Sequence, residues 1–229
     1  MTGLIVMAIV LLGCFGFLLF LRWKTDRDCR KRQEEWDAAH PRAQELLDKV
    51  KAAVSATTGQ VVTYKNQLIE ATYFSCSGGR TEDAVAVWGT DVPYLQAVDS
   101  PGEEKATHYA DTVHFTGTEF ARLLGLQLKG NPTTWLGAVT YTDGGGVATM
   151  TIGGTVFKGT ELRQKLGLSS TAFSLEVVAD VVKIVTKGFG HRVGMSQYGA
   201  EAMAVGGSSY QEILAYDYPG TRLTDHSQN

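Results

Sequence analysis

An internal repeat constrains the fold of the central part of this 229-residue chain. The pattern F-x-G-T-E-apolar-x-x-x-L-G-L occurs at residues 115–126 and returns at residues 157–168, 42 positions later. Each copy predicts the end of a strand, then a short helix with an acid in its first turn and a glycine at its exit. Two copies are too few for a solenoid, so we interpret them as two packing modules of one domain.

Around the repeat, alternating apolar and polar residues predict antiparallel hairpins. The three expected hairpins join residues 60–64 to 67–75 across Lys65-Asn66, residues 135–142 to 147–152, and residues 173–180 to 181–188. Helical patterns cover residues 42–54, where Leu46, Leu47, Val50 and Val54 share one stripe, and residues 196–205 and 209–216. The expected fold class is α+β, mostly antiparallel hairpins with short helices.

An uncharged run of eighteen residues occupies positions 4–21. As a helix it spans about 27 Å, close to the roughly 30 Å hydrocarbon core of a membrane. A cleaved signal peptide is the alternative, but no basic residue precedes the run and no small-residue cleavage site follows it. We therefore expect a transmembrane anchor in residues 1–21, a basic, charged linker in residues 22–41 and a folded domain in residues 42–225.

Composition excludes several classes of protein. With 44% hydrophobic residues the chain can support a packed core, which argues against disorder. The net charge of −3 leaves no basic excess for neutralising phosphates, so we expect no nucleic-acid partner. The cysteines Cys14, Cys29 and Cys76 form no C-x-x-C pair, which argues against a disulfide scaffold and a redox pair.

Residues 188–200 form the denser of two chemically unusual motifs, with glycines around polar side chains. Glycine allows sharp turns and close approach of the backbone to a ligand. His191 can exchange a proton or donate a hydrogen bond, and a following helix directs free N–H groups at the ligand. The binding candidates here are His191, Gly194, Ser196, Gln197 and Tyr198. The alternative interpretation is that His191 has a structural role and that Tyr198 lies partly in the core.

Residues 73–82 form the second motif, in which a predicted strand meets a glycine break. In a strand, Ser75 and Ser77 point to the same face and present two hydroxyls. The binding candidates here are Ser75, Ser77, Gly78, Gly79 and Thr81. An ordinary exit from strand to loop is the alternative, and it would be preferred if this motif stood alone.

In this order, the motifs S-x-S-G-G-x-T-E and GFGHRVGMSQYGAEAMA, followed by YQEILAYDYPGT, resemble the stage II sporulation protein D family. That family includes the amidase-enhancer domain of proteins that modify cell-wall hydrolases. The resemblance extends from about residue 50 to residue 223 and includes the segments TGQVVTY and WGTDVPYLQAVDSPGE.

The resemblance implies a lytic transglycosylase that cuts peptidoglycan glycan strands after an amidase has removed their stem peptides. Family members act during engulfment, outside the cytoplasmic membrane, so the expected partners are glycan strands, a cell-wall amidase and other engulfment proteins. The expected location is the cell membrane, with one span and an extracytoplasmic domain. The basic residues that follow the span favour the opposite orientation, but long domains cross membranes largely regardless of charge.

The chain departs from the family pattern at the residues that carry catalysis. The family's catalytic glutamate lies in a helix reading E-A-L-K-A-Q-A upstream of TGQV, and residues 22–58 contain no match. Glu82 is the only acid beside a candidate motif, and is a weak candidate for the catalytic role. The family's zinc ligands are represented at best by Thr25-Asp26 and Cys29, so we expect no cofactor.

Three interpretations follow from the resemblance and the departure. The chain is an active transglycosylase, a glycan-binding protein that enhances an amidase without cutting, or a fragment of a longer family member. Purified protein that released anhydro-muropeptides would favour the first interpretation over the other two.

Overall fold

The computed structural model describes residues 29–32, 34, 38 and 41–226, and the chain divides into two units at Gly59–Gln60. The first unit contains helix α2 (Pro41–Ala56), which confirms the helix expected over residues 42–54. The side chains of its apolar stripe are 42–62% exposed. No helix of the described residues is long and apolar enough to cross a membrane, and the predicted anchor at residues 4–21 lies outside them.

A small antiparallel sheet opens the second unit. β1 (Gln60–Tyr64) pairs with β2 (Gln67–Leu68) across the predicted turn, where both Lys65 and Asn66 have positive φ. On its other edge β1 pairs with β11 (Arg222–Asp225), near the end of the chain. The hairpin is confirmed, whereas the pairing of β1 with β11 joins segments that no local pattern connects.

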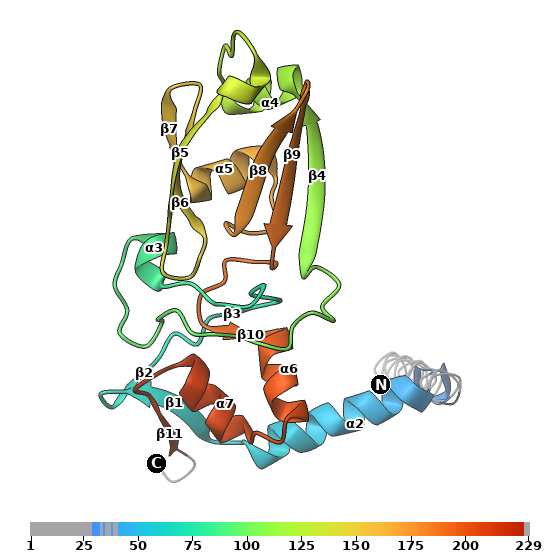
Figure 1. Cartoon of the computed structure of the whole chain (residues 1–229). Coiled ribbons are helices and arrows are strands. Elements are labelled where there is room, and N and C mark those ends of the chain that lie inside the picture. The colour runs from blue at the N-terminus through green and yellow to red at the C-terminus, as the bar shows by residue number, and fades with distance from the viewer. Residues whose placement is uncertain (1–28, 33, 35–37, 39–40, 227–229) are drawn as a thin grey trace, which may run out of the picture. The chain divides into compact units, whose positions relative to one another are not determined.

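Two antiparallel three-stranded sheets and two helices, all within residues 110–187, form a lobe (Figure 1). One sheet contains, in spatial order, β4 (Ala110–Thr116), β9 (Val181–Lys187) and β8 (Phe173–Val178). The other sheet contains β5 (Leu136–Tyr141), β6 (Val147–Ile152) and β7 (Thr155–Lys158). A short 3₁₀ helix, η1 (Pro132–Thr134), precedes β5. The second and third predicted hairpins are therefore confirmed as β5–β6 and β8–β9.

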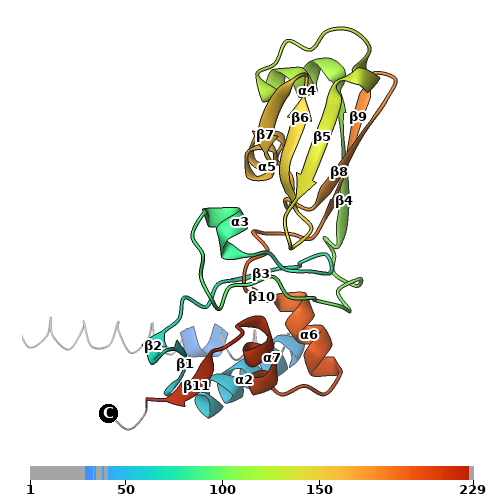
Figure 2. The same cartoon turned by 60° about the vertical axis from the view of Figure 1, so that its left-hand side comes forward.

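The two repeat copies form helices α4 (Gly117–Leu124) and α5 (Gly159–Leu166), each directly after a strand. Figure 2 shows α5 alongside β6 and β7. The apolar residues of both helices lie in one core with the strands, which confirms that the copies are packing modules. A Cβ on Gly159 would strike the carbonyl oxygen of Val147, so the glycine of the repeat allows the helix to touch the sheet.

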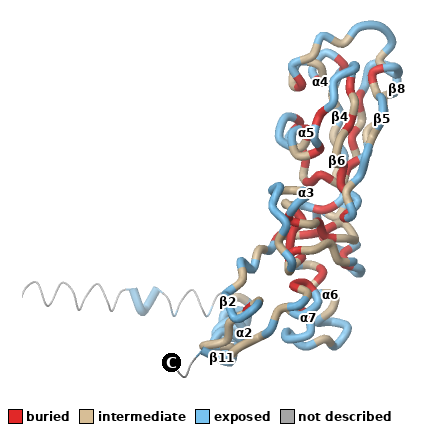
Figure 3. The backbone as a smooth tube through the Cα atoms, turned by 90° about the vertical axis from the view of Figure 1, so that its left-hand side faces the viewer, coloured by how far each residue is buried: buried red, intermediate tan, exposed pale blue. Residues whose placement is uncertain are grey.

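The rest of the second unit combines short helices with a two-stranded sheet. It contains β3 (Tyr73–Phe74), α3 (Ala84–Trp88), β10 (Met195–Ser196), α6 (Gln197–Val205) and α7 (Tyr210–Asp217). Ser196 and Ser209 cap α6 and α7, so both predicted C-terminal helices are confirmed. Figure 3 shows buried residues in this region as well as along the strands of the lobe. The α+β class with antiparallel sheets and short helices is confirmed, with the parallel pair β3–β10 as an exception.

The strand predicted over residues 67–75 is wrong in one respect. β2 ends at Leu68 and β3 begins at Tyr73, because the chain turns between them, where the N–H of Thr72 donates to the carbonyl of Glu70. Ser75 and Ser77 consequently follow the strand instead of lying within it. Their presentation on one strand face therefore does not occur.

Candidate functional site

The two glycine-rich motifs lie side by side. β3 and β10 pair in parallel, with Phe74 opposite Ser196. The backbones of Cys76 and Phe189 exchange hydrogen bonds of 2.7 and 3.3 Å, and the N–H of Tyr198 donates to the carbonyl of Ser75 at 3.1 Å. The two motifs that the sequence analysis treated as separate candidates thus lie together in one region.

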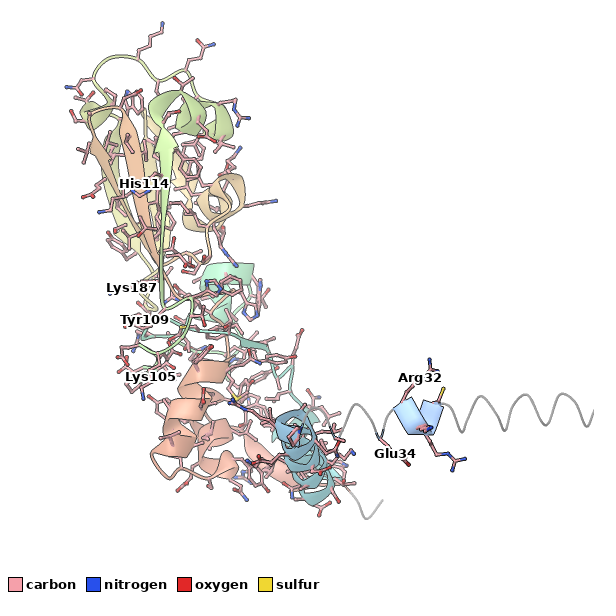
Figure 4. The ribbon with its side chains drawn as sticks, turned by 90° about the vertical axis from the view of Figure 1, so that its right-hand side faces the viewer. Arg32, Glu34, Lys105, Tyr109, His114 and Lys187 are labelled. Atoms are coloured by element: carbon pink, nitrogen blue, oxygen red, sulfur yellow. The ribbon has the colours of Figure 1, made fainter. Side chains whose placement is uncertain are left out.

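The glycine-rich loop of the motif at residues 188–200 begins where the sheet β4–β9–β8 ends. Lys187 is the last residue of β9, and Tyr109 directly precedes β4. Figure 4 shows these two residues beside each other. The N–H of Gly188 donates to the carbonyl of Tyr109 at 3.0 Å. The lobe therefore holds the start of the glycine-rich loop in place.

A buried carboxylate, Glu103, joins the two motifs. Its side chain is only 1% exposed. It accepts hydrogen bonds from the N–H groups of Ser77, Gly78 and Gly79 at 2.8–3.2 Å, and from the hydroxyls of Ser77 (2.7 Å), Ser100 (2.8 Å) and Ser196. Successive backbone N–H groups that converge on an anion form a nest, and here the anion belongs to the protein. Glu103 fixes the conformation of both loops at once.

The charge state of Glu103 follows from these contacts. Burial acts to raise the pKa of its carboxyl, but the hydrogen bonds from Ser196, Ser77 and Ser100 outweigh burial and lower that pKa. The carboxylate is therefore ionised at neutral pH. A general acid needs the opposite, a carboxyl whose raised pKa keeps its proton, so Glu103 is a positioning residue.

Glu103 does not stand out in the sequence, although it ends the segment WGTDVPYLQAVDSPGE. The available signal was an acid that follows Ser100 and Gly102 in a stretch of turn-forming residues. That signal does not reveal which distant N–H groups the carboxylate binds.

Glu82, the weak catalytic candidate, is also buried, at 1% exposure. Its Oε1 lies 3.2 Å from Nη1 of Arg192 and accepts hydrogen bonds from the Thr142 hydroxyl at 2.8 Å and the Gly146 N–H at 2.9 Å. Burial raises the pKa of this carboxyl, opposed by the hydrogen bond from Thr142 and the charge of Arg192. Because the side chain is enclosed by the protein, it does not present a proton to a bound polymer.

His191 is half-buried, beside exposed aromatic side chains. Its Nδ1 accepts a hydrogen bond from the Val193 N–H at 3.1 Å, which leaves the ring proton on Nε2 in the neutral form. The imidazole lies between Phe74 and Trp88, with ring centroids at 5.6 and 5.3 Å. Burial lowers the pKa of His191, so the ring is neutral at pH 7. Trp88 remains 47% exposed beside it.

The other predicted binding residues divide by exposure. Ser77, Thr81, Gly194 and Ser196 are buried; Ser75, Gly78, Gly79 and Tyr198 are half-buried, and Gln197 is exposed. The hydroxyls of Ser77 and Ser196 are bound to Glu103, and that of Thr81 accepts a hydrogen bond from the Val98 N–H at 2.8 Å. These buried hydroxyls organise the loops, and the surface open to a ligand is the one around His191.

Cys29 is exposed and Cys76 is buried, while Thr25 and Asp26 lie outside the described residues. Within the part of the chain that the structure describes, no three His, Cys, Asp or Glu side chains gather into a group that could hold a metal ion.

A further buried acid, Asp217 on α7, is expected to make stability depend on pH. It is 3% exposed, and burial, together with the charge of Glu103, raises its pKa to about 7. The unfolded value is about 3.9, so its stabilising contribution is complete below about pH 4 and is lost as the pH rises towards 7. We expect the free energy of unfolding to fall by up to about 1.4 kcal/mol per pH unit through this window.

Denaturant unfolding at pH 5, 6, 7 and 8 measures this effect, with Asp217→Asn as the test variant. The decline between pH 5 and 7 should be smaller in the variant, whereas Asp91→Asn at an exposed position should retain the full wild-type decline. An unchanged slope in Asp217→Asn would contradict the assignment.

Known proteins resemble the chain over most of its length, although no family model matches it. It is 40% identical to the stage II sporulation protein D of Bacillus subtilis (strain 168), over 90% of this chain and 58% of that protein. It is 43% identical to the protein of that name from Bacillus amyloliquefaciens, over 84% of this chain and 55% of the relative. An amidase enhancer of Bacillus subtilis (strain 168) is 29% identical, over 76% of this chain and 32% of the relative. The chain thus spans about half the length of the two sporulation proteins.

Proposed function

Because the chain belongs to the stage II sporulation protein D family, we propose that it takes part in peptidoglycan remodelling during sporulation. Within that process, its role is to bind glycan strands at the surface around His191. The relatives' names support a role related to sporulation and the cell wall, and the residues of the candidate site support the proposal of glycan binding.

The exposed aromatic surface beside the ordered loops carries this proposal. Trp88 is 47% exposed next to His191, and Phe189, from the same loop as His191, is 43% exposed. Sugar rings have apolar faces that pack against aromatic side chains and hydroxyls that take polar partners. Glu103 holds the loops through hydrogen bonds, so little ordering is needed when a strand binds.

Binding, not cleavage, is the role we propose for the described residues. Breaking a glycosidic bond as a lytic transglycosylase requires a carboxylic acid within reach of the leaving oxygen. Glu103 is ionised and fully engaged, and Glu82 is enclosed beside Arg192. A second candidate is enhancement of a cell-wall amidase, favoured by the relative named an amidase enhancer.

Co-sedimentation of the full chain with peptidoglycan stripped of stem peptides tests the proposal. We expect wild-type protein to sediment with the strands and to release no anhydro-muropeptides. Trp88→Ala should weaken binding roughly five- to tenfold, because it removes an exposed aromatic contact. Val178→Ala, an exposed apolar position on β8, is the control and should bind normally. Failure of the wild type to sediment rejects glycan binding, and release of anhydro-muropeptides rejects a role restricted to binding.

We further propose that the domain lies outside the cytoplasmic membrane, held by residues 4–21, since the glycan strands that it is proposed to bind lie there. Protease treatment of intact cells tests this placement. Complete protection of the domain from the protease would reject it.

A further inference from the structure

The two copies of the repeat each border an open cleft at the same place in the module. In the first copy a cleft of about 630 Å³ is lined by Thr118, Ala121 and Leu126, among others. In the second copy a cleft of about 540 Å³ is lined by the equivalent residues Thr160, Arg163 and Leu168. The repeat thus creates the same concave surface twice.

The backbones of the two copies agree closely around these clefts. The N–H of Leu126 donates to the carbonyl of Ala121 at 2.9 Å, and that of Leu168 donates to the carbonyl of Arg163 at 2.9 Å. Both helices end at a glycine in the left-handed region, with φ of 73° and 63°. The module therefore folds with alanine at this position in one copy and with arginine in the other. Packing alone does not require Arg163.

Arg163 is a half-buried cation without a carboxylate partner among the described residues. Its Nε makes a long hydrogen bond of 3.4 Å to the carbonyl of Leu168. Burial lowers the pKa of its guanidinium, and no acid in the described part of the chain offsets this effect. A partly desolvated charge without a partner is costly, which points to a partner that arrives from solution.

The two clefts differ in what surrounds them. Only the second includes Phe189, whose ring lies 4.8 Å from that of His108. The loop of the proposed glycan-binding surface reaches this cleft through Phe189, and the charge of Arg163 contributes to the lowered pKa of His191, after burial. Gln164 and Thr160 add an amide and a hydroxyl to the lining. The hydroxyl of Ser169 donates a hydrogen bond to the carboxylate of Asp111 at 2.8 Å, so the Asp111 side chain is held against the serine.

From these observations we propose that the cleft of the second copy is a subsite for a sugar that bears a carboxylate, with Arg163 as the residue that selects it. A guanidinium presents parallel N–H donors that match the two oxygens of a carboxylate, and the exposed ring of Phe189 matches the face of a sugar. The inference rests on the proposed glycan binding. In peptidoglycan the muramic acid residue carries such a carboxyl group, free when its stem peptide is absent and converted to an amide when the peptide is attached. Arg163 thus favours stripped strands over substituted ones.

Calorimetric titration of the full chain with three probes tests the subsite. The probes are glycan strands stripped of stem peptides, the same strands with their carboxyl groups converted to primary amides, and uncharged N-acetylglucosamine oligomers. The wild type should bind stripped strands roughly tenfold or more tightly than amidated strands, as expected for hydrogen bonds to a charged group. This difference should shrink at high salt, because ions screen a partly exposed pair.

Arg163→Ala should bind stripped and amidated strands equally, at the affinity of the wild type for amidated strands. The sister copy carries alanine at this position, so the variant is expected to fold, and an unchanged melting temperature checks this. Arg122→Ala, in the cleft of the first copy, is the matched control and should retain the wild-type preference.

Two results would overturn the subsite while leaving glycan binding intact. One is equal affinity of the wild type for stripped and amidated strands, and the other is an undiminished preference in Arg163→Ala. If the wild type bound none of the three probes, the proposed function would fail, and the subsite with it.

Discussion

Replacing Glu103 with alanine is expected to lower the free energy of unfolding by about 4–6 kcal/mol. The change removes the acceptor for three backbone N–H groups and three hydroxyls that are buried or half-buried. Each buried donor left without a partner costs about 1–3 kcal/mol. Since a typical domain has a total stability of 5–15 kcal/mol, the variant should melt far below the wild type or fail to fold.

Thermal and urea unfolding measure this loss, with Glu104→Ala as the matched control. Glu104 is the next residue, carries the same charge and is exposed, so its loss should change stability by no more than about 0.5 kcal/mol. Similar losses in the two variants would contradict the role assigned to Glu103.

A second variant, Glu103→Gln, separates charge from shape. Because the folded pKa of Glu103 is lowered, its ionised form contributes stability above about pH 4.3, and this contribution is lost as the pH falls through the folded pKa. The glutamine variant should be less stable than the wild type at pH 7, and the difference should narrow at acidic pH.

Arg192→Ala is expected to cost about 3–5 kcal/mol, because it leaves the buried charge of Glu82 unpaired. Arg192 also donates to the carbonyls of Ser77 at 2.8 Å, Arg80 at 2.6 Å and Gly144 at 2.8 Å, so its loss detaches two loops from the segment that carries it. The side chain is 2% exposed, and water does not easily replace these contacts. Urea unfolding at pH 7 measures the loss.

The control is Lys183→Ala, which breaks an exposed cross-strand pair with Glu176 at 2.8 Å. Exposed ion pairs contribute about 0–1 kcal/mol, so this variant should stay near wild-type stability. A double variant, Glu82→Gln with Arg192→Ala, should be more stable than Arg192→Ala alone, because the stranded charge is gone. Additive losses would show that the two side chains act independently.

Local sequence patterns predicted much of the secondary structure. The three hairpins, the two repeat helices and the capped C-terminal helices all depend on contacts between residues close in the chain. Turn geometry, capping and the alternation of apolar residues act over a few positions, so a sequence reveals them. The strand over residues 67–75 was the error, since a turn at residues 70–72 interrupts it without a glycine or proline to mark it.

The arrangement of the candidate site could be predicted from the sequence only in part, and the reason is physical. His191 and the two glycine-rich motifs stood out by composition, and the structure brings them together through the pairing of β3 with β10. That pairing joins distant segments, and no local preference encodes it. The burial of Ser77 and Ser196 hydroxyls against Glu103 likewise depends on which segments meet.

The sequence by itself determined the repeat, the hairpins, the helix ends and the resemblance to the sporulation family, because these are written in residue types at short, fixed spacings. Tertiary structure alone decided the roles of the charged groups. It made Glu103 an ionised anchor, enclosed Glu82 with Arg192, and left Arg163 without a carboxylate beside an open cleft. The pKa of a side chain and its partners are set by what surrounds it in space, and most of those neighbours are far away in the chain.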